Sequence, residues 1–259
     1  MNDRAKIEER TARDLFRIEK ESRYLIKRSE EEEALEAVFD RQTLFTLYSM
    51  INKGIIDYLN GVVRAGKEAR VYWGVKGDSD LAVKIFYTST APFKRRAIYI
   101  TADPRFKGIK SFGRAMLMAW VRKEFKNLKQ AEDAGVRVPH PVYCERNILV
   151  MEFIGEKGIP AKTLSELSNI TQKDYRAVIN SIEKLYNYAK IVHSDLSEYN
   201  IFKFKKQIIL FDFGSAVDIA HPMAEEFLVR DIKTINRFFK KFDIEVYEPE
   251  TLLRKVGLL

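Results

Sequence analysis

The sequence predicts an α+β fold, in which a group of short strands is followed by a half that is mostly helical. Residues 62–87 hold three apolar runs separated by glycine-containing turns, which is typical of antiparallel strands. Residues 114–134 and 171–190 carry apolar side chains at helical spacing. Strands and helices gathered in separate parts of a chain are typical of the α+β class. Two polar segments, 193–200 and 212–214, follow apolar runs in the second half, so a functional site is expected there.

Composition limits the class of protein. Apolar residues make up 46% of the 259 residues, which is enough for one large core or two small ones. No apolar run approaches the roughly 18 residues that cross a bilayer, and the first residues are too charged for a secretory signal. Cys144 is the only cysteine, which excludes an intramolecular disulfide and a cysteine-based zinc site. We therefore expect a cytoplasmic protein with no membrane partner.

The net charge is 45 − 37 = +8, which favours polyanionic partners such as nucleic acid or a phosphorylated ligand, although a merely basic protein would look the same. The most basic stretch is 88–129. Its first half has no clear period and is predicted to be a long, mobile loop kept for function. Ser89, Ser111 and nearby threonines are candidate targets of self-modification.

The region before residue 58 predicts a small helical segment. Acids and bases lie three or four apart through residues 4–37, which supports an exposed helix. Apolar residues recur at helical spacing through 44–55, and Lys53-Gly54 is a predicted helix end. Residues 1–58 are interpreted as a packing cap on the next domain, with a helix-turn-helix nucleic-acid module as the less favoured alternative.

The two polar segments predict a phosphoryl-transfer site. Asp195 precedes Asn200 by five residues, and an Asp-Phe-Gly tripeptide begins at Asp212 after an apolar run. Asp195 can accept the proton of an attacking hydroxyl, so Asp195 and Asp212 are the candidate catalytic residues. Asn200 and Asp212 offer hard oxygen ligands and are the candidate Mg²⁺ ligands. The alternative is ordinary turn chemistry in both loops.

Lys84 is predicted to bind the phosphates of ATP. It lies within the apolar run 81–87, where an unpaired ammonium would be costly, and it is placed like the lysine that holds α- and β-phosphates in kinases. Glu124, one of only two acids in the basic stretch, is its candidate partner. The alternatives are a surface lysine and an ordinary solvent-facing glutamate.

The Gly66-Lys67-Glu68 turn between two predicted strands is a candidate phosphate cradle. Neither G-x-G-x-x-G nor G-x-x-x-x-G-K-[ST] is present, but a short turn can still present backbone N–H groups to phosphate oxygens. Residues 147–155 form a predicted buried strand that leads into a hinge. There the C=O of Glu152 and the N–H of Ile154 would pair with adenine, unless the segment is a plain core strand.

The tail differs from that of a standard protein kinase. After Gly214 only 45 residues remain, and no activation segment ending in A-P-E is visible. We therefore expect the surface that usually grips a peptide to be missing. His221, beside a proline, is interpreted as a turn or helix-entry residue rather than a base.

These residues resemble a known family. Gly66-Lys67-Glu68-Ala69 with Val71-Tyr72 is similar to the S-T-G-K-E-A-x-V-Y signature of RIO atypical serine/threonine protein kinases, Rio-one subfamily. The segment from His193 to Asn200 resembles that family's H-x-D-L-S-E-Y-N. The resemblance extends from about residue 38 to about residue 242, and the short chain is similar to the minimal archaeal form.

The resemblance implies a truncated two-lobed protein-kinase-like fold with an additional N-terminal helical segment. Residues 59–154 would be the kinase N-lobe with its long basic loop, and 155–259 a reduced C-lobe. It also implies ATP with Mg²⁺ or Mn²⁺, autophosphorylation on serine and a role in maturing the small ribosomal subunit. Some members act chiefly as ATPases through phosphorylation of the aspartate at the Asp-Phe-Gly position.

Two departures from the family pattern matter. Arg64-Ala65 stands where the family has Ser-Thr, which removes hydroxyl contacts to phosphate there. Phe213-Gly214 follows Asp212 where the family more usually has other residues.

Three hypotheses follow. The leading one is an ATP-dependent serine kinase or ATPase. The second is an rRNA-binding assembly factor that uses the ATP site as a conformational switch, and the third is a small-molecule kinase.

Overall fold

The computed structural model describes residues 40–88, 99–100, 102–106 and 113–258. The chain divides into two compact units, residues 1–44 and 45–259, of which the first is described only at 40–44. The helix predicted in 4–37, both candidate serines and most of the predicted mobile loop lie outside the described residues. The predicted domain boundaries at 58/59 and 154/155 remain predictions.

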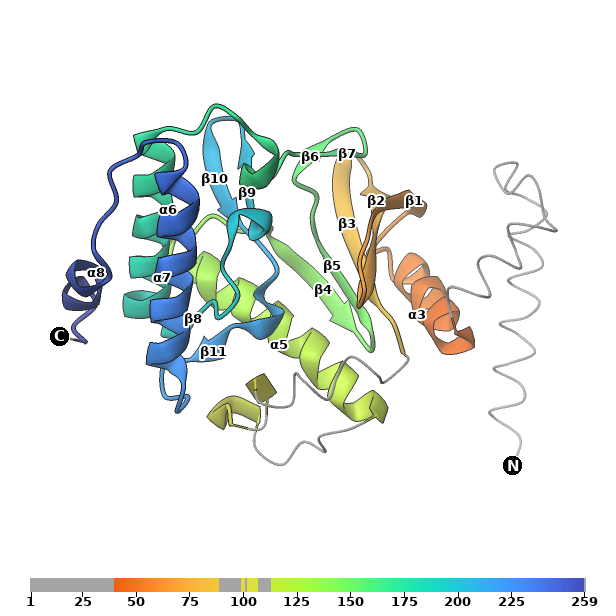
Figure 1. Ribbon diagram of the computed structural model, residues 1–259. Helices are drawn as coiled ribbons and strands as arrows, with labels where there is room; N and C mark the ends of the chain where they lie inside the picture. The colour runs from red at the N-terminus through yellow and green to blue at the C-terminus, as the bar shows by residue number, and fades with distance from the viewer. Residues whose placement is uncertain (1–39, 89–98, 101, 107–112, 259) are drawn as a thin grey trace, which may run out of the picture. The chain divides into compact units, whose positions relative to one another are not determined.

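The strands of the main sheet, β1–β5, precede the helices α6, α7 and α8 along the chain, so strands and helices are largely segregated, as is typical of an α+β fold (Figure 1). The helices are α3 (Arg41–Asn52), α5 (Gly113–Asp133), α6 (Gln172–Lys184), α7 (Ala224–Lys240) and α8 (Pro249–Lys255). The strands are β1 (Tyr58–Ala65), β2 (Ala69–Lys76), β3 (Ser79–Phe86), β4 (Pro141–Glu145), β5 (Ile148–Glu152), β6 (Gly155–Glu156), β7 (Ile159–Pro160), β8 (Ile191–Val192), β9 (Ile201–Phe204), β10 (Gln207–Leu210) and β11 (Val217–Asp218).

Five antiparallel strands form one sheet in the order β1-β2-β3-β5-β4. Short glycine-containing turns join β1 to β2 and β2 to β3, which confirms the strand–turn–strand pattern of the sequence. Strand β3 is central, and its register places Lys84 opposite Val71 on one side and Leu149 on the other. Lys84 is therefore held in the middle of the sheet with apolar neighbours.

Helix α5 lies along the sheet and reaches the helical half of the molecule (Figure 1). The helical spacing of the sequence predicts an apolar face made of Met118, Val121, Phe125 and Leu128. Val121 and Leu128 are buried, but Met118 and Phe125 are only partly buried. The helix also buries the polar side chains of Lys123, Glu124 and Asn127. The buried surface of α5 is wider than the predicted face, because the helix is covered both by the sheet and by the segment after β10.

Helix α6 delivers the chain to β8 and the loop that follows. Thr171 caps the helix: its N–H donates to the Asp174 carboxylate at 2.8 Å, and its hydroxyl accepts from the Asp174 N–H at 3.4 Å. The helix ends in a π-helical turn, Leu185–Ala189, and β8 begins two residues later. The antiparallel hairpin β9–β10 then brings Asn200 and Phe211 together, with a 3.0 Å bond from the Phe211 N–H to the Asn200 C=O.

His221 is a helix-entry residue, as predicted. Its Nδ1 accepts a hydrogen bond from the Met223 N–H at 3.1 Å, and its C=O accepts from the Ala224 N–H at 2.9 Å. Both donors lie at the start of α7, whose first N–H groups lack partners within the helix. Among the helices in the described parts of the chain, none is long and apolar enough to span a membrane.

Candidate active site

Lys84 joins the sheet to both of the carboxylates that the sequence places near it. Its ammonium lies 2.7 and 3.0 Å from the two Glu124 oxygens and 2.8 Å from Asp212 Oδ1. Glu124 is 1% exposed and Lys84 12%, whereas 47% of the Asp212 side chain is exposed. Burial opposes the charged form of Lys84, but the two carboxylates outweigh it and raise its pKa above the ordinary value. The predicted Lys84–Glu124 pair is therefore present.

Asp212 adopts a left-handed backbone conformation, with φ +66° and ψ +59°. Aspartate tolerates this region better than most residues, and such conformations gather at functional sites. The next residue, Phe213, is fully buried and packs edge-on against the His193 ring at 4.7 Å between centroids. This apolar anchor leaves Asp212 directed toward Lys84 and solvent.

Asp195 and Asn200 lie on one loop and are held by each other. The Asn200 Nδ2 donates to the Asp195 C=O at 2.8 Å. This bond uses the amide nitrogen, so the amide oxygen is the atom that a hard cation would take. The Asp195 side chain is exposed, as a group that meets a substrate hydroxyl must be.

The donor set around Asn200 and Asp212 fits Mg²⁺ bound together with a nucleotide. The hairpin β9–β10 places Asn200 beside Phe211, the neighbour of Asp212. No cluster of three or more His, Cys, Asp or Glu side chains suited to a metal occurs among the described residues. Mg²⁺ commonly takes only one or two protein oxygen ligands and completes its shell with phosphates and water.

Asp231, which the sequence reasoning did not assign, holds the Asp195 loop from α7. Its carboxylate accepts the Ser194 N–H at 2.8 Å and the Leu196 N–H at 3.0 Å. Arg230 donates to the Ser194 C=O, and Ser194 has a left-handed φ of +67°. Burial raises the pKa of Asp231 to about 7. Asp231 lies among the buried apolar residues of α7, and an acid in such a position is the sequence feature that could have indicated its role.

The Gly66–Glu68 turn joins β1 to β2 at one end of the sheet. The Gly66 N–H donates to the Ala69 C=O, and the Glu68 C=O accepts from the Tyr87 N–H, each at 2.9 Å. A Cβ on Gly66 would meet the Ala69 oxygen at 3.4 Å, which is at the near edge of ordinary van der Waals contact. Its role in binding phosphate, Lys67 included, stays a prediction.

The predicted hinge follows β5. The Phe153 N–H donates to the Asp80 C=O at 3.3 Å, and the Ile154 C=O accepts from the Ala161 N–H at 2.8 Å. These bonds use neither the Glu152 C=O nor the Ile154 N–H, the two groups assigned to adenine. The Glu152 side chain pairs with Arg137 at 2.7 Å, so only its backbone remains for that assignment.

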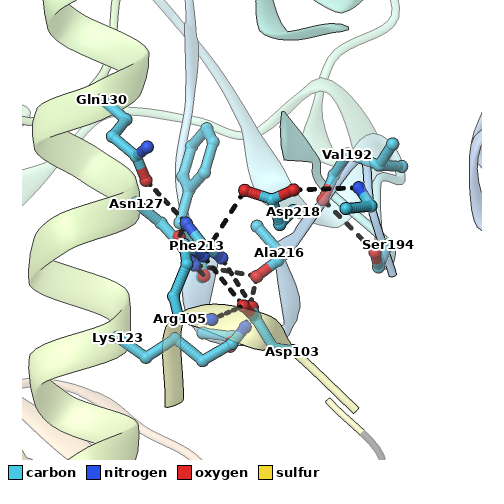
Figure 2. A network of polar contacts seen from close by, with 12 residues as sticks. Asp103, Arg105, Lys123, Asn127, Gln130, Val192, Ser194, Phe213, Ala216 and Asp218 are labelled. Carbon is cyan, nitrogen blue, oxygen red and sulfur yellow. Dashed lines mark hydrogen bonds and ion pairs between the residues drawn. The ribbon is translucent and has the colours of Figure 1, made fainter. Parts of the chain in front are cut away.

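A second set of polar side chains contacts the segment that begins at Asp212. Lys123 and Asn127 project from α5 toward the carbonyl groups of Phe213 and Ala216 (Figure 2). The sequence placed Lys123 in the basic stretch 88–129 and predicted no partner for it. Backbone carbonyl partners leave no mark in a sequence, so no pattern pointed to this contact.

The chain is similar in sequence to known proteins of one family. The family model described as "RIO domain" matches residues 70–252. The RIO-type serine/threonine-protein kinase Rio1 of Haloferax volcanii is 38% identical over 222 residues, which are 85% of this chain and 77% of the relative. The same-named protein of Methanocaldococcus jannaschii is 38% identical over 226 residues, 86% of this chain and 76% of its own. The human serine/threonine-protein kinase RIO1 is 34% identical, covering 86% of this chain and 40% of the relative.

Among solved structures, the chain is similar to the Rio2 kinase-ADP/Mg²⁺-phosphoaspartate complex of Chaetomium thermophilum. The TM-score is 0.62 at 22% sequence identity, over 82% of this chain and 65% of that one. At this identity the likeness concerns the fold alone. It confirms the predicted truncated two-lobed protein-kinase-like fold; of the additional N-terminal helical segment, only α3 lies within the described residues.

Proposed function

Because this chain belongs to the RIO-domain family of serine/threonine-protein kinases, we propose that it transfers the γ-phosphate of ATP to its own serines, to water, or to both, during maturation of the small ribosomal subunit. The observation that carries the proposal is that the carboxylates of Glu124 and Asp212 both lie within 3.0 Å of the Lys84 ammonium. A lysine held between a buried acid and an exposed acid is arranged for an anionic ligand and its counter-ion.

Lys84 would contact the α- and β-phosphates, and Glu124 would fix its position. Glu124 is almost fully buried, so it cannot follow the ligand and instead sets where the ammonium lies. Asp212 is half exposed and is the carboxylate that a cation can reach. The turn at Gly66–Glu68 and the hinge at Glu152 and Ile154 would bind the phosphates and the base, respectively.

Asp195 would orient the attacking hydroxyl or water and accept its proton. Asn200 and Asp212 would hold Mg²⁺ or Mn²⁺, which when bound neutralises charge on the transferring phosphoryl group. The loop that carries Asp195 is fixed by Asp231, so the proton acceptor is placed before the substrate arrives.

The ATPase route would pass through Asp212. The solved Rio2 kinase is a complex with ADP, Mg²⁺ and a phosphoaspartate. In this chain a carboxylate oxygen of Asp212 would attack the γ-phosphorus, with ADP as the leaving group, and water would then hydrolyse the acyl phosphate. The exposed carboxylate favours this assignment.

The test uses ATP labelled at the γ-phosphate. Wild type should incorporate label, and Asp195→Ala should lose transfer while still binding ADP. Label that resists hydroxylamine would be phosphoserine, whereas label that hydroxylamine removes would be the acyl phosphate. Glu198→Ala, in the same loop, is the matched control. Equal transfer by wild type and Asp195→Ala would overturn the role of Asp195. Stimulation of ATP hydrolysis by immature small ribosomal subunits tests the cellular role.

A second candidate function is rRNA binding with the ATP site as a switch. Arg122, Lys126 and Lys129 are exposed at positions i, i+4 and i+7, which lie on one face of α5. A basic face of this kind suits a phosphate backbone. Replacing all three by Glu should weaken RNA binding, and wild-type affinity should fall steeply with salt. If neither the triple substitution nor added salt lowers the affinity for RNA, this face of α5 is not an RNA-binding surface.

A further inference from the structure

We propose that Lys123 and Asn127 are positioning residues of the phosphoryl-transfer site, which grip the backbone after Asp212 and so fix where its carboxylate meets the metal. This inference rests on the proposed function. It deepens that function by naming groups that touch neither nucleotide nor metal.

The inner layer consists of α5 side chains that bind backbone carbonyls. Lys123 Nζ donates to the Gly214 C=O at 3.0 Å and also to the Ala216 C=O. Asn127 Nδ2 donates to the Phe213 C=O at 2.8 Å and to the Ala216 C=O at 2.9 Å. Three carbonyls within four residues of Asp212 thus accept bonds from one helix. Both donor side chains are fully buried, so water does not compete for these carbonyls.

The outer layer orients the Asn127 amide. Arg105 Nη1 donates to Asn127 Oδ1 at 2.9 Å and to Gln130 Oε1 at 2.6 Å. An arginine can only donate, so it fixes the amide oxygen on its own side and turns the amide nitrogen toward the Phe213 carbonyl. Figure 2 shows Arg105 lying between Asn127 and Asp103.

Asp103 fixes the guanidinium in turn. Its two oxygens accept from Arg105 Nε at 2.9 Å and from Arg105 Nη2 at 2.7 Å, which is the bidentate geometry that holds a guanidinium in plane. Asp103 is fully buried. Burial opposes its ionisation, but the contacts from Arg105 hold its pKa below the ordinary value. The pair therefore stays ionic.

Helix α5 consequently serves the site twice. One side chain, Glu124, sets the Lys84 ammonium, while Lys123 and Asn127 set the backbone that carries Asp212. The 2.8 Å separation of Lys84 and Asp212 is thus fixed from a single rigid element. Groups behind a metal ligand typically change metal affinity by about 10- to 100-fold when they are removed.

The test measures ADP binding by calorimetry with and without Mg²⁺, on the full chain. Lys123→Met keeps the length of the side chain but loses its donors, and Asn127→Asp keeps the oxygen that Arg105 binds but loses the amide N–H groups. Lys233→Met, at an exposed position of α7, is the control. We expect both test variants to lose about tenfold or more of the Mg²⁺-dependent gain in ADP affinity, with metal-free ADP binding unchanged.

Variants that fold and keep the wild-type gain from Mg²⁺ would overturn the proposal. Variants with a lower melting temperature but an unchanged gain from Mg²⁺ would indicate a purely structural role and would also overturn the proposal. If Lys123→Met does not fold, Asn127→Asp and Arg105→Gln, on the outer layer, decide the question by the same measurement. The readout needs no turnover, so absence of phosphate transfer in wild type would contradict only the proposed function.

Discussion

Lys84 and Asp212 are 128 residues apart in the sequence, and their side chains meet at 2.8 Å between Nζ and Oδ1. One comes from the centre of the five-stranded sheet and the other from the turn after β10. This contact joins a group that would bind phosphate to one that would bind metal. The ammonium and the Asp212 carboxylate form an ion pair, so their charges offset each other.

We expect Lys84→Met to abolish turnover and to destabilise the fold. The substitution leaves Glu124 buried without its cation, which typically costs about 3–5 kcal/mol of unfolding free energy. Loss of one electrostatic contact to the reacting group lowers kcat by about 100-fold or more. Urea unfolding and steady-state kinetics measure the two effects separately.

The double variant Lys84→Met/Glu124→Gln separates stability from activity. Removing the buried negative charge of Glu124 should restore much of the stability, because the loss of the Lys84 ammonium from beside this carboxylate is the source of the cost. Activity should remain low, since the phosphate-binding ammonium is still missing. Lys76→Met, an exposed lysine of β2, is the control. Recovery of activity in the double variant would contradict the role of Lys84.

Asp231→Asn should slow phosphoryl transfer. A carboxylate can accept both the Ser194 and Leu196 N–H groups, whereas an amide opposes one of them with its own NH₂. The Asp195 loop would lose one anchor, and kcat should fall about tenfold or more with little change in KM for ATP. A change in KM with no change in kcat would show that Asp231 does not position Asp195.

The same variant should change how stability depends on pH. The pKa of Asp231 is raised by burial to about 7, above an unfolded value of about 3.9. The folded state therefore binds the proton more tightly, and the wild type loses stability relative to Asp231→Asn as pH rises from about 4 to about 7. The difference changes by roughly 1.4 kcal/mol for each pH unit and is constant above pH 7. Urea unfolding of both proteins at pH 5, 6, 7 and 8 measures it. A difference independent of pH would mean that the pKa is not raised.

The sequence predicted the Lys84–Glu124 pair, in which both partners are side chains of opposite charge. Lys84 in an apolar run required an acid, and the basic stretch offered only two, so Glu124 could be named. Asp231, Lys123 and Asn127 could not be found in this way, because their partners are backbone N–H and C=O groups that every residue carries. The strand and helix pattern was recovered because its periodicity reflects burial. The buried residues of α5 were not predicted correctly, because a helix that is covered on two sides has no single apolar stripe.

Gly214→Ala should destabilise the turn at Asp212. A Cβ at this position would lie 2.8 Å from Trp120 Nε1, and Trp120 is buried and cannot move away. Overpacking of this kind costs about 1–3 kcal/mol and should also displace Asp212, which lowers activity. Thermal unfolding and Mg²⁺-dependent turnover measure the effects. The double variant Gly214→Ala/Trp120→Phe should cost less than the sum of the two single changes. Gly61→Ala, where nothing lies within 4 Å, is the control.

Tyr175→Phe should lower stability without changing the chemistry. The buried hydroxyl donates to Asn236 Oδ1 at 2.9 Å and accepts from the Tyr247 N–H at 2.8 Å, so it ties α6 both to α7 and to the segment before α8. Its removal leaves the buried Asn236 oxygen and the Tyr247 N–H without that partner, at a cost of about 1–3 kcal/mol. Melting temperature should fall by several degrees, whereas kcat at a temperature where the variant is folded should stay within about twofold of wild type. The exposed Tyr188→Phe should change neither quantity. A loss of kcat in folded Tyr175→Phe would contradict this prediction and would show that α6 also positions the Asp195 loop for the reaction.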